Sequence, residues 1–307
     1  MEYPKFKVSV SCMTYNQSKY ITDAMNGFTM QQTSFPFVCT IVDDASTDGE
    51  QEVIRKYVEE NFDFSEGSVA YQKETDYAHI TYAQHKTNKN CYFAVLYLKE
   101  NHYSQKKDKS PYLKEWRDGV EYMALCEGDD YWLLSDKLQK QYEMMERYPR
   151  MTLCTTAGVM KYPSGDFEYV NKYSCDLVSC PPEDVIFSTP GFLLTCSLFY
   201  RIKVLPSPLP LWVTECPVGD RPLQLMLLSR GTIGYINILA SCYRVAANGS
   251  WTLSMSRKKR VVHYIKMRKM WKSFNKWSEY KYSPIIIRRI LNNDIYLVKE
   301  LIHWGFS

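Results

Sequence analysis

The N-terminal part of the chain alternates between strand-like and helix-like segments, and this alternation restricts the possible folds more than any other feature. Residues 7–13 (KVSVSCM) form a β-rich apolar run, and a helix is expected after Ser18, a candidate N-cap. The apolar residues of this helix recur at helical spacing: Ile21, Ala24, Met25 and Phe28. A second β-rich run over 37–42 precedes a helical pattern over 51–61. This order predicts an α/β fold with right-handed connections and a parallel sheet.

Later segments repeat the pattern less regularly. We expect strands over 92–98, 122–126 and 233–243, whereas 70–92 is mixed in character and is interpreted as an insertion. Residues 101–109 (NHYSQKKDK) are polar and are expected to form a mobile loop.

Further helices carry terminal signals. One is expected to begin at Ser135, a candidate N-cap, and to end at Pro149. A second has Pro222 in its first turn and Gly231 just after its end. The stretch 257–307 is helical in pattern, basic and aromatic.

Composition indicates a folded globular chain. With 307 residues, of which 45% are hydrophobic and 23% charged, collagen-like, coiled-coil and disordered classes are excluded. The ten cysteines form no CxxC pair and no zinc-ligand cluster with histidine. The first residues lack a secretion-signal pattern, and no apolar run approaches the length of a membrane span. We therefore expect a reduced cytoplasmic location without a spanning helix.

Acidic pairs follow two of the expected strands: Asp43 and Asp44 after one, Asp129 and Asp130 after the other. The carboxyl ends of strands form the ligand crevice of open α/β sheets. Carboxylates that meet there repel one another, and Mg²⁺ or Mn²⁺, which takes carboxylate and phosphate oxygens as ligands, offsets the repulsion. The alternative is that such aspartates cap helices or tighten turns, which is the interpretation we favour for Asp48.

Several motif blocks give the chain a family resemblance. In chain order they are VSCMTYNQSKYITDAM, VCTIVDDASTDG, ALCEGDDYW with DKLQKQ, GDRPLQLML and YRVAANGSW. Together, over roughly residues 5–251, they resemble the inverting family 2 glycosyltransferases of the GT-A fold. The resemblance implies a Rossmann-like mixed α/β sheet that binds a nucleoside diphosphate sugar.

The resemblance also implies donor-binding residues. Thr14 and Tyr15 match positions after the first strand, where an aromatic ring stacks on the base, and Asp44 matches a carboxylate that accepts a uracil N–H. The full implied donor set is Thr14, Tyr15, Asn16, Asp44, Asp129 and Arg244. For Tyr15 the alternative is a half-buried packing role.

The block Glu127-Gly128-Asp129-Asp130 matches the family's metal-binding acidic motif, DXD, with glutamate as its first acid. The resemblance implies that Asp130 binds Mn²⁺ or Mg²⁺ and that Asp129 contacts the ribose or supports the metal indirectly. Such a cation neutralises charge on a departing diphosphate. The alternative is an acidic turn stabilised by packing of Trp132.

Asp220 matches the family's general base. In an in-line displacement the acceptor hydroxyl loses its proton as it attacks, and a carboxylate within hydrogen-bond reach can take it. Because Asp220 lies just before Pro222, spacing alone favours a helix cap or a partner of the helix dipole. The two roles are compatible.

One position departs from the family pattern. Many members have histidine two residues after the arginine of the Tyr243-Arg244 pair, whereas this chain has Ala246, so one expected metal or phosphate contact is missing. Ser250 and Trp251 are candidates for closing the site, and packing is an equal alternative.

Four other residues carry less weight. Asn101 and His102 resemble a family loop that reaches over the donor, although a histidine in a polar loop is expected to be solvent-exposed. Thr195 and Ser197 lie where acceptor contacts are expected, although burial as small residues in a strand is favoured.

Positive charge is concentrated near the C-terminus. Residues 257–289 contain twelve lysines and arginines and one acid, Glu279, so this segment carries +11 and the rest of the chain −7. The asymmetry predicts an anionic partner. One helical stripe of the segment is apolar: Met267, Met270, Trp271, Phe274 and Trp277. The lysines lie off this stripe: Lys266, Lys269, Lys272 and Lys276.

Two interpretations of this tail stay open. A lysine-rich helix with an apolar face is typical of attachment to an anionic membrane surface. Alternatively, the stripe packs on the rest of the protein and the lysines form a solvated face. Nucleic-acid binding is less favoured, because no matching motif accompanies the patch.

The sequence therefore predicts a GT-A domain over 1–256 and an appended helical segment over 257–307. Within the domain, 1–132 would bind the nucleotide sugar and 133–256 the acceptor. The expected activity is inverting transfer from a nucleoside diphosphate sugar, with UDP favoured, to a saccharide or polyprenyl-diphosphate-linked acceptor. A bacterial polysaccharide pathway is the expected context, at the inner face of the membrane if 257–289 attaches there.

Two other functions are considered. A non-catalytic GT-A-shaped module would bind nucleotide or saccharide without turnover. A nucleotidyltransferase would need a glycine-rich basic loop after the first strand, and CMTYNQS lacks one.

Overall fold

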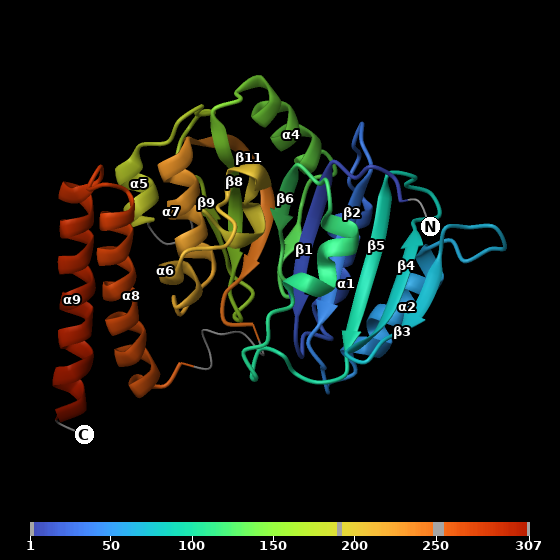
Figure 1. Cartoon of the computed structure of the whole chain (residues 1–307), viewed down its shortest axis with the longest axis horizontal. Helices are drawn as coiled ribbons and strands as arrows, with labels where there is room; N and C mark the ends of the chain where they lie inside the picture. Colours follow the sequence, from blue (N-terminus) through green and yellow to red (C-terminus); the bar gives the residue numbers. More distant parts are fainter. Residues whose placement is uncertain (1–2, 189–191, 248–254, 306–307) are drawn as a thin grey trace.

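The computed structural model describes residues 3–188, 192–247 and 255–305, which form a mixed sheet of eleven strands with helices on both faces (Figure 1). The strands are β1 (Val8–Thr14), β2 (Phe37–Asp43), β3 (Tyr71–Glu74), β4 (Ala78–Gln84), β5 (Cys91–Leu98), β6 (Tyr122–Leu125), β7 (Tyr131–Trp132), β8 (Met151–Lys161), β9 (Phe167–Val170), β10 (Phe199–Arg201) and β11 (Thr232–Arg244). The α-helices are α1 (Ile21–Thr29), α2 (Glu50–Asn61), α3 (Lys114–Arg117), α4 (Lys137–Arg147), α5 (Pro182–Phe187), α6 (Leu211–Thr214), α7 (Asp220–Arg230), α8 (Arg257–Trp277) and α9 (Ser283–Gly305). Short 3₁₀ turns are η1 (Ser110–Leu113), η2 (Thr195–Ser197) and η3 (Ile202–Val204).

The centre of the sheet is parallel, as predicted. Strands β5, β2, β1 and β6 run side by side in the same direction. β10 joins β6 to β8 through antiparallel pairs, and β11 pairs with β8 in parallel. The segment 70–92, which we interpreted as an insertion, supplies β3 and β4, which extend the sheet beyond β5. The predicted mixed α/β sheet is confirmed.

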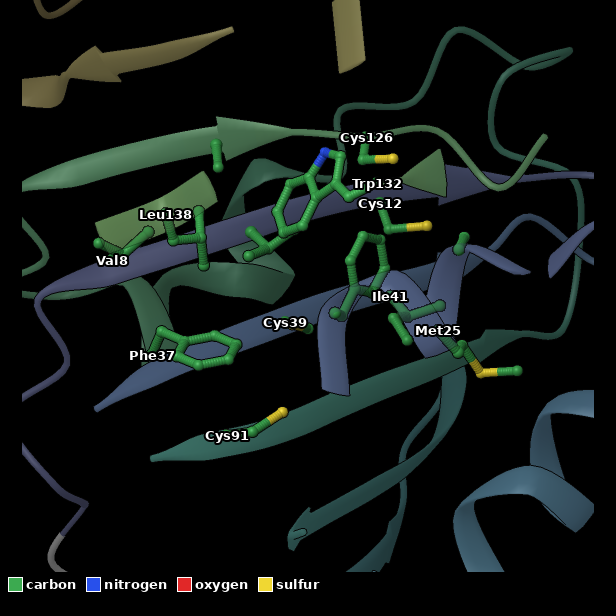
Figure 2. Packing of buried hydrophobic residues seen from close by; sticks show 14 of the residues in the cluster. Val8, Cys12, Met25, Phe37, Cys39, Ile41, Cys91, Cys126, Trp132 and Leu138 are labelled. Carbon is green, nitrogen blue, oxygen red and sulfur yellow. The ribbon is translucent and has the colours of Figure 1, made fainter. Parts of the chain in front are cut away.

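The main core layer lies between the sheet and helices α1, α2 and α4. Alternate residues of β2 point to opposite faces, so Cys39 and Ile41 enter this layer while Val38 packs on the other side. Figure 2 shows Cys12 and Cys91 within the same layer. All ten cysteines are free and eight are buried, so these thiols serve as small apolar core residues.

Two predicted helix caps are wrong. The N-cap of α1 is Tyr20, and the backbone N–H of Ser18 instead donates to Asp48 Oδ2 (3.0 Å). The N-cap of α4 is Asp136, and Ser135 uses its backbone carbonyl to bind the loop after α1. In both places a contact with a distant segment fixes the loop before the helix. Asp48 also accepts from the first N–H of α2, which agrees with its interpretation as a turn residue.

The C-terminal helices α8 and α9 lie side by side at one end of the molecule (Figure 1). The apolar stripe of α8 is buried against the cluster that α5 and α7 contribute to, with Trp271 and Phe274 fully covered. Of the two interpretations of this stripe, packing on the protein is therefore right, and the stripe itself is not free to meet a membrane. Within the described ranges, no helix combines the length and apolar character needed to cross a membrane.

Candidate active site

The parallel strands β1, β2 and β6 end at one edge of the sheet, and the loops that follow them meet there. The N–H of Asp44, just after β2, donates to the carbonyl of Thr14 at the end of β1 (3.0 Å). The N–H of Gly128, after β6, donates to the carbonyl of Met13 (3.1 Å). Three segments that carry predicted site residues are thus joined by backbone hydrogen bonds.

The loop after β1 is built around a buried carboxylate. Glu50, fully buried at the start of α2, accepts hydrogen bonds from the Thr14 hydroxyl and from the N–H of Gln17 (2.9 Å). Asn16 has a left-handed backbone (φ 55°), and its Oδ1 accepts from the N–H of Thr47. Tyr15, also in this loop, reaches solvent and is 39% exposed. The predicted Thr14 and Asn16 therefore shape the loop, and Tyr15 is presented on it.

Asp44 holds the segment 101–109 over the edge of the sheet. Its carboxylate accepts the backbone N–H groups of His102 and Tyr103 (both 2.9 Å) and pairs with Lys109 (3.2 Å). The Asn101 amide donates to the carbonyl of Asp44 (3.0 Å). The expectation of a solvent-exposed His102 is wrong, because these bonds draw its side chain under the loop, where it is 1% exposed.

The acidic turn after β6 brings three carboxylates together. Oxygens of Glu127, Asp129 and Asp130 all lie within 4.8 Å of one another. Asp130 is fully buried, and its Oδ1 accepts from the N–H of Arg244 (2.8 Å). Its Oδ2 is buried without a hydrogen-bond partner among the described residues. A buried carboxylate oxygen left unpaired is costly, and a bound cation would satisfy it.

The three carboxyl groups have raised pKa values, with burial as the first cause in each. Desolvation by the surrounding turn, together with the charges of Asp129 and Asp220, raises the pKa of Glu127 to about 7, although its side chain still reaches solvent. Burial raises the pKa of Asp129, and burial followed by the charges of Asp129 and Glu127 raises the pKa of Asp130 well above its usual range. Clustered oxygens, mutual repulsion and the unpaired Oδ2 all fit a hard divalent cation.

Arg244 clamps the acidic turn from the end of β11. Its guanidinium donates to the carbonyl of Asp129 (2.6 Å) and pairs with Asp23 of α1. The same group lies over the rings of Tyr20 (4.9 Å) and Tyr131 (4.5 Å). The residue predicted to contact the donor thus also fixes the backbone of the metal motif.

Asp220 is the first residue of α7 and does not cap that helix. The N-cap is Gly219, and no side-chain cap bond forms. Within the ranges that the structure describes, no hydrogen bond to the Asp220 carboxylate is found, yet its charge contributes to the raised pKa of Glu127. The charge of the candidate base therefore acts on the acidic turn, and its carboxylate accepts no hydrogen bond from the described residues.

Sequence reasoning missed three residues that support the site. Glu50 organises the first loop, and Asp23 anchors Arg244. Lys137 is fully buried with its ammonium 4.3 Å from the Trp132 ring centroid, and burial lowers its pKa to about 8. An acid directly after the Asp48-Gly49 turn is the one sequence signal that could have indicated Glu50.

The remaining residues that the sequence analysis named as candidates differ in where the structure places them. Ser197 is fully buried, as favoured, but in the 3₁₀ turn η2 rather than a strand. Thr195 begins the same turn. Ala246 follows β11 with a left-handed backbone (φ 53°). Ser250 and Trp251 lie outside the described residues.

Gly128 is required by the close approach of the first loop. A Cβ at this position would lie 2.1 Å from Thr14 Oγ1 and 2.6 Å from Gln17 Oε1. We predict that Gly128→Ala lowers the free energy of unfolding by about 1–3 kcal/mol, because an atom is forced into a packed site. Chemical denaturation measures the change. Gly219→Ala is the control, since nothing lies within 4 Å of its Cβ, and an equal loss in both variants would contradict the prediction.

Comparison with known proteins gives both sequence and structural matches. No protein-family model matches the chain. It is 29% identical over 251 residues to the uncharacterized protein Rv1520 of Mycobacterium tuberculosis, a match that covers 80% of this chain. Mb1547 of Mycobacterium bovis gives the same values. The chain spans 60% of the length of these curated relatives.

Solved structures share the fold. TarS of Staphylococcus aureus (residues 1–349) in complex with UDP-GlcNAc matches 94% of this chain and 72% of its own, with a TM-score of 0.59 at 16% sequence identity. The same fragment in complex with UDP matches 98% of this chain and 73% of its own, with a TM-score of 0.53. The likeness confirms the predicted GT-A fold.

Proposed function

We propose that this chain is an inverting glycosyltransferase that moves a sugar from a UDP-sugar to a hydroxyl group of a saccharide or polyprenyl-diphosphate-linked saccharide. One observation carries the proposal: the acidic turn and Asp220, 90 residues apart in the chain, lie close enough for Asp220 to raise the pKa of Glu127. A carboxylate cluster that fits a cation is therefore electrostatically coupled to Asp220, whose carboxylate accepts no hydrogen bond from the described residues and can accept a proton.

The donor would lie between the first loop and the acidic turn. Tyr15 offers an exposed ring for the base, and Asp129 and Arg244 lie beside the position proposed for the diphosphate. Asp44 would receive a base N–H at a carboxylate that also accepts the N–H groups of His102 and Tyr103. UDP is the favoured nucleotide because the TarS structures that share this fold hold UDP-GlcNAc or UDP.

The reaction assigns one role to each group. The acceptor oxygen forms a bond to the anomeric carbon as the bond from that carbon to the diphosphate breaks, and UDP leaves with the electron pair. Asp220 accepts the proton of the acceptor hydroxyl. Asp130, with Asp129 and Glu127, would hold Mn²⁺ or Mg²⁺. When bound, the cation supplies charge neutralisation for the departing diphosphate.

The same proposal assigns a role to each part of the chain. Residues 1–132 would bind the donor and 133–256 the acceptor, with 257–307 as an appended segment. The reaction would take place in the cytoplasm, at the inner face of the cell membrane when the acceptor is lipid-linked.

Release of UDP tests the proposal without knowledge of the acceptor. The protein is incubated with UDP-GlcNAc and other UDP-sugars, with Mn²⁺ or with a chelator, and UDP is measured. We expect slow metal-dependent release through attack by water. If UDP-sugars bind, as measured by calorimetry, but no UDP is released with Mn²⁺, the non-catalytic binding module replaces the enzyme. If none binds, both are excluded.

A further inference from the structure

The outer face of α9 carries an apolar stripe that no part of the described chain covers. The residues of this α9 stripe are Ile287, Leu291, Ile295, Val298 and Ile302. Their spacing of three or four places them on one helical face, and each is 51–57% exposed. Aliphatic side chains are rarely gathered in this way on a surface without a partner. The stripe is distinct from the buried stripe of α8.

The exposed charged side chains of the α8–α9 hairpin are nearly all cationic. Nine lysines and arginines are exposed between residues 257 and 302: Lys258, Lys259, Lys266, Lys269, Lys272, Lys276, Lys281, Arg288 and Lys299. The one exposed acid in the same range is Glu279, at the turn between the helices. Both acids of α9 are paired with arginines of α8, Asp294 with Arg268 and Glu300 with Arg260.

These ion pairs neutralise both acids of α9 and leave the hairpin with a large excess of exposed positive charge. Among the exposed cations, Lys269 and Arg288 pair with acids of the protein body. Val262 and Ile265 of α8 add exposed apolar area. A cationic surface with an aliphatic stripe matches the interface of an anionic lipid bilayer, which accepts apolar side chains below its phosphates. A second copy of this chain is a poorer match, because it would bring like charges together.

We infer that the α8–α9 hairpin attaches this protein to an anionic membrane surface through the α9 stripe. The aliphatic side chains enter the boundary between headgroups and acyl chains, and the surrounding lysines contact lipid phosphates. The attachment needs no nucleotide, metal or turnover. A test of membrane binding is therefore independent of the proposed glycosyl transfer.

Flotation with lipid vesicles tests this inference. We expect the full chain to bind vesicles made of equal parts of phosphatidylcholine and phosphatidylglycerol and to bind phosphatidylcholine vesicles weakly. The double variant Leu291→Glu/Ile295→Glu should lose roughly tenfold or more in vesicle affinity, because two inserted side chains are replaced by anions. The matched control is Leu211→Glu, which changes a leucine 75% exposed on α6 and should bind like the unmodified protein.

A second variant tests the contribution of the lysines to membrane binding. Lys272→Gln/Lys276→Gln should weaken binding by about fivefold per lysine, the equivalent of about 1 kcal/mol each. Circular dichroism melting checks that each variant is folded. Equal binding by the Leu291→Glu/Ile295→Glu variant and the Leu211→Glu control would overturn the inference. So would a stripe variant that changes the oligomeric state in light scattering while vesicle binding stays constant, since a second copy would then cover the stripe.

Discussion

Asp220→Asn should lower kcat for sugar transfer by about 100- to 10,000-fold while UDP-sugar binding stays unchanged. The asparagine keeps the size of the side chain but cannot accept the proton of the acceptor hydroxyl. Asp220 makes no cap bond to α7, so the substitution removes only a charge near the helix N-terminus. That charge contributes about 0.3–1 kcal/mol to stability, too little to unfold the protein. Steady-state kinetics and donor calorimetry together separate the chemical step from binding.

Glu52→Gln is the matched control for this prediction. Glu52 also lies in the first turn of a helix, α2, and its side chain is 73% exposed. The control should show a similar small change in melting temperature and no change in kcat. If both variants fall equally in kcat, or if Asp220→Asn keeps the turnover of the unmodified protein, Asp220 is not the base.

The sheet and the acidic turn could be predicted because their signals are local. The β-rich runs, the apolar spacing of α1 and the acids near the ends of β2 and β6 all lie within short windows. Parallel strands then place those acids at one edge. The contact that holds Arg244 against the acidic turn gives no such signal, because Arg244 pairs with Asp23, 221 residues earlier in the chain. A contact of this kind has no periodicity and depends on the final packing of both segments.

The loops and the tail show where local rules fail. Ser18 and Ser135 have the residue type of a cap, but contacts with distant segments set the starts of α1 and α4. The aromatic stripe of α8 was recognised as apolar, yet its burial depends on α5 and α7, which sequence alone does not position. Periodicity identifies an apolar face and leaves open what covers it.

Asp130→Asn should abolish the metal response while leaving the metal-free protein at least as stable as the unmodified one above pH 7. In the unmodified protein, burial and the charges of Asp129 and Glu127 raise the pKa of Asp130 well above its value in the unfolded chain. Asparagine is neutral at every pH, so it avoids the cost of burying either the charge or the proton that neutralises it, and we expect a gain of about 1–3 kcal/mol without metal. Turnover should fall by about 100-fold or more, because a bound cation contributes several kcal/mol to the transition state.

The pH dependence follows from the same shifts. A carboxyl group whose folded pKa is raised holds its proton in the native state at pH values where the unfolded chain has lost it. The metal-free protein should therefore lose stability as pH rises from about 4, where unfolded carboxyls ionise, through the Glu127 pKa of about 7. Asp130→Asn should show a shallower loss, because the contribution of Asp130 is gone.

Mn²⁺ should reverse this loss in the unmodified protein, adding about 2.7 kcal/mol at a hundredfold excess over its Kd. Its affinity should rise with pH through 7, since Glu127 must be ionised to contribute an oxygen. Thermal denaturation with and without Mn²⁺ across this range measures both effects. Asp136→Asn, an exposed acid just before α4, is the control and should retain the full Mn²⁺ response. A Mn²⁺-dependent rise in melting temperature that persists in Asp130→Asn would place the cation elsewhere and remove the metal from the proposed mechanism.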